Sequence, residues 1–404
     1  MGVLKAHDPL LYESIINELY SEDFLGKLEQ LITQNVYPPY SISINGTWGS
    51  GKTTLLKLLE KRLINGGYPV VWFNPWEYER MNDVVMAFLQ QIVFQFSQKF
   101  NLNEKELGIF AISLFTAGID TVARFFSGGN LSYENVKNIV QDVNKEYRDE
   151  YESFNNIVEK IKEDFSNITY KIWKNHNNKP LIIFFDDLDR CLPEKAIDLL
   201  EALKNLFVVK GAKVIFISGI DTWIAKQFII QRYGDISRDF ALNYFRKIFN
   251  LTIDIPRSSS LPIDKLIENY IKDLFKDMKF DLYLSGFIGD IIDLARHSET
   301  NSLRSIINVI NNFYTLWIIS DKKLYYDRIL LALLFLKELW NDFFQFMVAS
   351  INKTEGKSLF NFTYDNQLLR DKYFSHDPRL RSFMENEMIN IYANENFMTF
   401  IKLI

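Results

Sequence analysis

Cysteine and histidine are scarce in this sequence, which has one Cys and four His among its 404 residues. A single cysteine, Cys191, excludes an internal disulfide framework and fits a reducing compartment, so the sequence predicts a cytoplasmic protein. The same scarcity leaves few side chains for metal-dependent or nucleophilic catalysis. We find no residue pattern typical of a nuclease, a protease or a deaminase.

Long apolar runs are also lacking. The N-terminus has no apolar core of the kind found in signal peptides. The apolar run at residues 107–119 is too short to span a bilayer, and Asp120 and Arg124 interrupt its continuation. We interpret this run as a packed or interfacial helical hairpin, and a segment that contacts a membrane without spanning it is the alternative.

Positive charge is not in excess either. The net charge is −5, and the sequence contains no basic cluster. Both features argue against a nucleic-acid-binding protein, although they leave a local basic face open. Aromatic residues, in contrast, are abundant, with 34 Phe and 20 Tyr. They are expected to fill a core, and the alternative is that some lie exposed on a surface that binds a partner.

The most informative stretch is a glycine-rich octamer that matches the phosphate-binding pattern G-x-x-x-x-G-K-[ST]. A β-branched segment at residues 41–45 precedes it, and residues 54–63 follow with apolar side chains at helical spacing. In such a strand–loop–helix unit, backbone N–H groups surround phosphate oxygens at the N-terminus of the helix. The predicted nucleotide-binding residues are Gly46, Thr47, Trp48, Gly49, Ser50, Gly51, Lys52, Thr53 and Thr54.

A second motif supplies acidic residues. The apolar residues 181–185 are followed directly by Asp186 and Asp187, and the carboxyl end of a buried strand is where open α/β sheets bind ligands. We expect Asp186, together with the Thr53 hydroxyl, to hold Mg²⁺, and Asp187 to polarise the attacking water. Lys52 is expected to contact the β- and γ-phosphates. The two motifs together predict an ATP or GTP site.

Other side chains are candidates for contacts with the γ-phosphate. Ser218 or Asp221 follows the strand expected between the two motif strands, although Asp221 fits equally well as the N-cap of the next helix. Arg304 is a candidate lid cation, and a plain surface position is the alternative. The further cation candidates are Arg190, Arg246 and Lys247.

Predicted strands and helices alternate in the first part of the chain, and helices alone follow. This order predicts a parallel α/β core with a helical C-terminal domain. Roughly 100 residues separate the second strand from the third, far more than one crossover needs, so we predict an insertion. The predicted domains are residues 1–100 with the N-terminal helices and the first part of the core, 101–176 as the helical insertion, 177–258 as the second part of the core, and 259–404 as the helical lid and C-terminal domain.

At this point the chain resembles the KAP family of P-loop NTPases. The resemblance covers about residues 10–320, and it rests on the glycine-rich octamer and on Phe73–Tyr78, Asp186–Cys191, Tyr244–Phe249 and Asn301–Arg304. It implies a three-layer α/β P-loop NTPase fold with a parallel sheet, of the class with an extra strand between the two motif strands. It also implies ATP as the nucleotide, and bacterial members of the family are linked to defence against phage and plasmids.

Two departures from the family pattern are visible. Many members carry transmembrane helices between the two motifs, where this chain has a mostly polar insertion. Leu303 stands before the candidate lid arginine, where the pattern usually has proline. ATPases of this class commonly complete their sites with a cation from a neighbouring subunit, which implies a homo-oligomer with Arg246 or Lys247 as the donated cation.

Three functions are compatible with these features. The first is an ATPase whose hydrolysis drives or times a conformational change in an assembly. The second is a nucleotide-gated signalling scaffold with slow or incidental hydrolysis that recruits a separate effector protein. The third, an ATP-regulated nucleic-acid-binding protein, is disfavoured by the acidic balance. The motif residues favour the first without excluding the second.

Overall fold

The computed structural model describes ten stretches of the chain, and they form two compact units. The core unit comprises Asp23–Gly46 and Lys52–Ile255, and the second unit contains the helices from residue 263 onward, with the loop Thr47–Gly51 grouped with it. The apolar run at 107–119 and the first part of the predicted N-terminal helices lie outside the described residues. The residues that the structure describes are 22–80, 84–100, 102, 154–234, 238–255, 263–275, 281–298, 302–320, 328–350 and 366–388.

The core unit is built on a parallel sheet of five strands in the order β2-β3-β4-β1-β5. Its strands are β1 (Tyr40–Asn45), β2 (Val70–Phe73), β3 (Leu181–Phe185), β4 (Val214–Ile220) and β5 (Leu251–Asp254). Strand β4 pairs with both motif strands, so that Ser218 lies opposite Ser43 of β1 and Phe185 of β3. The α/β fold with an extra strand between the motif strands is therefore confirmed.

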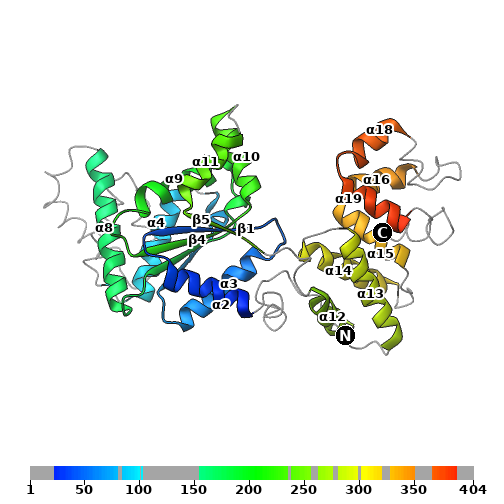
Figure 1. Ribbon diagram of the computed structural model, residues 1–404, viewed down its shortest axis with the longest axis horizontal. Helices are drawn as coiled ribbons and strands as arrows, with labels where there is room; N and C mark the ends of the chain where they lie inside the picture. Colours follow the sequence, from blue (N-terminus) through cyan, green and yellow to red (C-terminus); the bar gives the residue numbers. More distant parts are fainter. Residues whose placement is uncertain are drawn as a thin grey trace. The chain divides into compact units, whose positions relative to one another are not determined.

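Helices cover both faces of this sheet, which is why β3 and β4 consist of buried residues throughout. Figure 1 shows α2 (Glu22–Gln30) and α3 (Lys52–Asn65) together on one side of the sheet. The other side packs α4 (Val84–Lys99), α8 (Phe154–Asn175) and α9 (Pro193–Ala202) in one apolar cluster with side chains of β3 and β4. Also in this unit are the π-helical turns η1 (Leu31–Asn35) and η5 (Leu203–Phe207), and the helices α10 (Thr222–Tyr233) and α11 (Arg238–Ile248).

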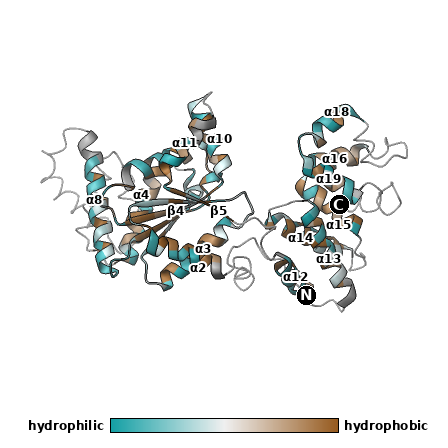
Figure 2. Cartoon of the chain, in the orientation of Figure 1, coloured by the Kyte–Doolittle hydropathy of each residue, from teal (hydrophilic) through white to brown (hydrophobic). Residues whose placement is uncertain are grey.

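Helix α8 lies within the predicted insertion, yet it is part of the packed core. Its residues Ile161, Phe165, Ile168 and Ile172 are buried in the same cluster as the sheet residues of β3. They recur at helical spacing, and polar side chains occupy the opposite face, so α8 alternates between hydrophilic and hydrophobic residues along its length (Figure 2). The sequence therefore predicts the helix, and the structure adds that this helix covers the sheet.

The second unit is entirely helical in its described residues. It consists of α12 (Ile263–Leu274), α13 (Asp281–His297), α14 (Leu303–Ile319), α15 (Arg328–Leu339), α16 (Asn341–Ser350), α18 (Gln367–Leu369), η8 (Arg370–Phe374), α19 (Pro378–Phe383) and η9 (Met384–Met388). Residues 330–336 of α15 are all buried, so this helix forms the centre of the unit. Among the described residues, no helix is long and apolar enough to cross a membrane.

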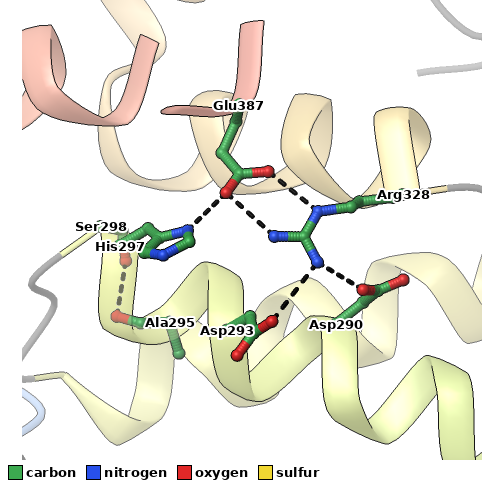
Figure 3. A network of polar contacts seen from close by, with 7 residues as sticks. All are labelled: Asp290, Asp293, Ala295, His297, Ser298, Arg328 and Glu387. Atoms are coloured by element: carbon green, nitrogen blue, oxygen red, sulfur yellow. Dashed lines mark hydrogen bonds and ion pairs between the residues drawn. The ribbon is translucent and has the colours of Figure 1, made fainter. Parts of the chain in front are cut away.

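A charged network ties three elements of this unit together (Figure 3). Arg328 of α15 donates two hydrogen bonds of 3.0 Å to the buried carboxylate of Glu387 on η9 and pairs with Asp290 of α13. The paired carboxylates raise the pKa of Arg328, so the guanidinium stays charged. His297 also contacts Glu387, at 2.5 Å. The network is thus a polar cross-link between α13, α15 and the end of the described chain.

Candidate functional site

The glycine-rich loop turns tightly between β1 and α3. Gly49 has φ +77° and Gly51 has φ +93°, a left-handed backbone that favours glycine because it has no Cβ. Within the loop, the Ser50 N–H donates to the Thr47 carbonyl at 3.2 Å. Helix α3 begins directly after the loop, at Lys52. The local backbone therefore has the strand–turn–helix form that the sequence predicts.

Lys52 is held by two oxygen partners in the core unit. Its side chain is 8% exposed, and its Nζ donates to the Gly46 carbonyl at 2.7 Å and pairs with Asp189 Oδ2 at 3.2 Å. Asp189 Oδ2 also accepts from the Asp221 N–H at 3.1 Å. Asp189 thus positions the ammonium group of Lys52 beside the carboxyl end of β3.

Asp186 lies at the carboxyl end of β3 and is 1% exposed. Burial raises its pKa to about 6, the negative charge of Asp187 adds to this rise, and a hydrogen bond with Thr53 opposes it. The Oδ1 atom of Asp186 is buried and has no hydrogen-bond partner in the part of the chain that the structure describes. The Thr53 hydroxyl and the Asp186 carboxylate, which the sequence assigns to Mg²⁺, are therefore side by side.

The neighbouring strand leaves room for this carboxylate. A Cβ on Gly219 of β4 would lie 2.8 Å from Asp186 Oδ1 and 2.7 Å from Leu56 Cδ1, closer than real Cβ contacts. The preceding residue, Ser218, is buried, and among the described residues its Oγ has no hydrogen-bond partner. β4 therefore brings a small residue, Gly219, to the side of Asp186.

Asp187 has a different environment. Its backbone is left-handed, with φ +58°, and its side chain is half-buried against two partners. Arg190 pairs with Oδ1 at 2.7 Å, and the Asn74 amide donates to Oδ2 at 3.3 Å. Burial raises the pKa of Asp187, while the charge of Arg190 lowers it. The Arg190 guanidinium also lies over the ring of Trp76, on the turn η2 (Pro75–Tyr78) that follows β2.

The remaining predicted residues lie in three other places. Asp221 caps α10, where its side chain accepts from the N–H groups of Trp223 and Ile224. Arg246 and Lys247 are exposed in the last turn of α11. Arg304 is exposed in the first turn of α14, in the second unit. The cap interpretation of Asp221 is therefore confirmed, and the roles of the three cations stay predictions.

The sequence analysis gave no role to Asp189, Gly219 or Asn74. Asp189 has a visible signal, because it is the third acid in five residues after an apolar strand. Asn74 also has a signal in the sequence, because it directly follows β2. The edge of the sheet at which β2 ends also carries Asp187. Gly219 has no such signal, because the sequence does not show that the Asp186 carboxylate lies close to this glycine.

The residues present fit a bound Mg²⁺ ion. Among the described residues, no group of three or more His, Cys, Asp or Glu side chains is placed to hold a metal. Mg²⁺ at a phosphate-binding loop does not need such a group, because it takes one or two protein oxygens and completes its shell with phosphate and water oxygens. The buried Oδ1 atom of Asp186 and the adjacent Thr53 hydroxyl are such oxygens.

The raised pKa of Asp186 predicts a pH-dependent stability. Its pKa rises from 3.8 to about 6 on folding, so the folded chain binds this proton more tightly than the unfolded chain. The free energy of unfolding should then fall as the pH rises from about 4 to about 6, by up to about 3 kcal/mol from this group. Asp186→Asn should therefore raise the melting temperature of nucleotide-free protein in EDTA at pH 7.5, and the gain should disappear at pH 4. An equal gain at both values would contradict the assignment.

The chain has sequence and structural similarity to known proteins. An uncharacterised protein from Methanocaldococcus jannaschii is 27% identical over an alignment that covers 34% of this chain and 84% of that protein. The crystal structure of Cdc6p from Pyrobaculum aerophilum aligns with a TM-score of 0.41 at 12% identity, over 98% of this chain and 95% of that one. The sequence model of the KAP family P-loop domain matches residues 21–317. Because this match covers most of the chain, the chain belongs to the KAP family of P-loop NTPases.

Proposed function

We propose that this protein binds ATP with Mg²⁺, hydrolyses it and couples the nucleotide state to assembly or signalling. One observation carries the proposal. Among the described residues, three buried oxygen atoms have no hydrogen-bond partner and lie on Asp186 and Asp189, just after β3, and on Ser218 of β4. Buried polar atoms without partners cost free energy, and Asp186 and Asp189 lie beside Lys52, as a site for a polar, charged ligand would need.

Each side chain has a role in this proposal. Lys52 binds the β- and γ-phosphate oxygens, and Asp189 holds its ammonium group in place. Thr53 and Asp186 hold Mg²⁺, which when bound supplies positive charge to the phosphate oxygens. Asp187 accepts a hydrogen bond from the attacking water and orients it. Arg304, Arg246 and Lys247 are proposed to stabilise the negative charge of the transferred phosphoryl group.

A second function is favoured by the environment of Asp187. Both of its oxygen atoms are engaged, one by Arg190 and the other by Asn74. A carboxylate held in this way orients water poorly until these two contacts break. ATP would then stay bound for a long time before it is hydrolysed. This supports a nucleotide-gated scaffold that recruits a separate effector when ATP is bound. The two functions share one site and differ in the rate of hydrolysis.

Lys52→Ala tests the ATP site. The variant loses charge-assisted hydrogen bonds to phosphate, so its affinity for a fluorescent ATP analogue with Mg²⁺ should fall by about 10- to 100-fold. Lys57→Ala, one and a half turns along the same helix, removes an equal charge that is paired with Glu60, and should bind normally. Wild-type affinity in Lys52→Ala would exclude the site.

Lys52→Ala also leaves Asp189 without its cation, so a second variant separates binding from stability. Thr53→Ala keeps the Lys52–Asp189 ion pair and removes only the hydroxyl beside Asp186. Its affinity for the analogue should fall in Mg²⁺ and match that of the wild type in EDTA. Circular dichroism melts of both variants check that each is folded.

The target of the nucleotide switch is proposed to be a separate protein. A role in defence against phage or plasmids is part of this proposal, and it rests on the family alone. Purification of Asp187→Asn protein from the native host with ATP, beside Lys52→Ala protein as the control, would identify partners that require the ATP-bound state. Partners recovered equally with both variants would contradict a nucleotide-gated interaction.

A further inference from the structure

A row of alternating rings and lysines crosses the surface of the core unit. Lys213 Nζ lies 5.0 Å from the ring centre of Tyr37 and 5.3 Å from that of Trp173. Lys174 Nζ lies 5.1 Å from the same tryptophan and 5.6 Å from the ring of Tyr170. The Tyr170 and Trp173 rings are 5.5 Å apart. Lys213 therefore lies near the Tyr37 and Trp173 rings, Lys174 lies near the Trp173 and Tyr170 rings, and we call these five residues the ring–lysine row.

The row is open to solvent. Tyr37 is 78% exposed and Tyr170 is 46% exposed, large fractions for aromatic side chains. Lys174 is exposed, and Trp173 and Lys213 are half-buried. These aromatic rings are thus exposed to solvent in the folded protein, which is a feature of surfaces that bind a partner.

Three distant segments build the row. Tyr37 comes from the turn before β1, Tyr170, Trp173 and Lys174 come from the last turns of α8, and Lys213 directly precedes β4. Contacts fix the segments to one another, because the Lys213 N–H donates to Thr169 of α8 at 3.1 Å and the Lys213 ammonium donates to the Tyr37 hydroxyl at 3.2 Å. No window of the sequence contains this cluster, which explains why the chain shows no basic run.

The charge of this surface is opposite to that of the whole chain. The segments 30–59, 166–185 and 202–220 contain no aspartate or glutamate, although the chain has a net charge of −5. Lys210 adds an exposed cation in the turn before Lys213, and this turn packs on α8 because Gly211 lies against Ser166. Within the described part of the chain, neither Lys174, Lys210 nor Lys213 forms an ion pair with a carboxylate.

We propose that the ring–lysine row and Lys210 bind single-stranded nucleic acid. Unpaired bases stack on exposed aromatic rings whatever their sequence, and lysines beside the rings neutralise the phosphates that join successive bases. Lys174 and Lys213 each lie within 5.6 Å of two rings, so a base stacked on a ring has an ammonium group near its phosphate. A duplex, whose bases are already stacked, offers no base faces to the rings.

An anionic membrane is the other surface that tyrosine, tryptophan and lysine suit, and the geometry favours it less. Peripheral binding to lipid needs apolar side chains that protrude into the acyl region. Here two of the three rings are tyrosines, and ammonium groups lie over all three rings. The row also lies at the amino ends of β1 and β4, whereas Asp186 follows the carboxyl end of β3. It is therefore a site separate from the one that binds nucleotide.

Fluorescence anisotropy of the full chain with a labelled oligothymidylate of about 20 nucleotides tests the proposal. Tyr37→Ala and Tyr170→Ala should each weaken binding by about 5- to 150-fold, the loss of one stacked base. With three lysines on phosphates, the logarithm of the association constant should fall with the logarithm of salt with a slope of about −2. Lys213→Ala should reduce the magnitude of that slope by about 0.7.

Two controls are matched to these variants. Lys162→Ala removes a lysine from the same helix that is paired with Glu159, and Trp223→Ala removes an exposed ring from α10. Both should bind the oligonucleotide like the wild type, and so should Lys52→Ala, since the row does not depend on the nucleotide site. Failure of the wild type to bind, or an equal loss in the controls, would overturn the proposal. The wild type could instead bind vesicles that contain phosphatidylserine and fail to bind the oligonucleotide. If Tyr37→Ala then abolished the binding to vesicles, the row would be assigned to a membrane.

Discussion

Asp187→Asn is expected to bind ATP with Mg²⁺ as the wild type does and to hydrolyse it about 10²–10⁴-fold more slowly, the usual contribution of a positioned general base. The substitution suits the local backbone, because asparagine tolerates the left-handed conformation that Asp187 adopts at φ +58°. Its side-chain carbonyl still accepts the hydrogen bond from Asn74. Only the negative charge is lost, so the folded structure should persist.

The measurement is single-turnover hydrolysis beside equilibrium binding of the same nucleotide. Arg190→Met breaks the same ion pair as Asp187→Asn but keeps the carboxylate, so it should hydrolyse ATP at or above the wild-type rate. An equal loss in both variants would assign the effect to the ion pair rather than to the carboxylate. Normal turnover by Asp187→Asn would leave Asp189, the neighbouring buried acid, as the group to test. Faster turnover by Arg190→Met would also support the gated function.

Much of the core could be predicted because its signals are local. A β-branched run before a glycine loop predicts β1, and the five apolar residues before Asp186 predict β3. The position of β4 between them followed from the family resemblance, and the register confirms it. The periodicity of residues 154–174 predicts a helix, but it does not say what the helix covers, and α8 proves to be part of the core.

The partners of the site residues could not be predicted, because they depend on side-chain positions in three dimensions. Lys52 and Asp189 are far apart in the sequence and meet only because β3 ends and α3 begins at the same edge of the sheet. The left-handed backbone of Asp187 also has no sequence signal, since aspartate is common in every turn type. The ring–lysine row has the same origin, because Tyr37 and Lys213 come together through strand order.

The second large effect is expected from the cations of α11. Phe245, Ile248 and Phe249 are buried on one face of this helix end, so Arg246 and Lys247 point outward. Within the described part of the chain, neither cation forms an ion pair with a carboxylate. The helix leads into β5, the edge strand beside β1. We propose that a neighbouring copy of the chain uses these exposed cations at its ATP site.

Arg246→Ala or Lys247→Ala should therefore retain ATP affinity and lose about 10³–10⁵-fold in turnover, the contribution of a cation delivered in trans. Specific activity of the wild type should rise with protein concentration. Arg232→Ala on the adjacent α10 is the matched control, because that arginine is already paired with Asp198 at 3.0 Å. Mixing Arg246→Ala with Lys52→Ala should restore part of the activity, since Lys52→Ala protein keeps its own α11 cations and the other variant keeps an intact ATP site. Turnover that is independent of concentration, from protein that light scattering shows to be monomeric with ATP bound, would exclude a cation in trans.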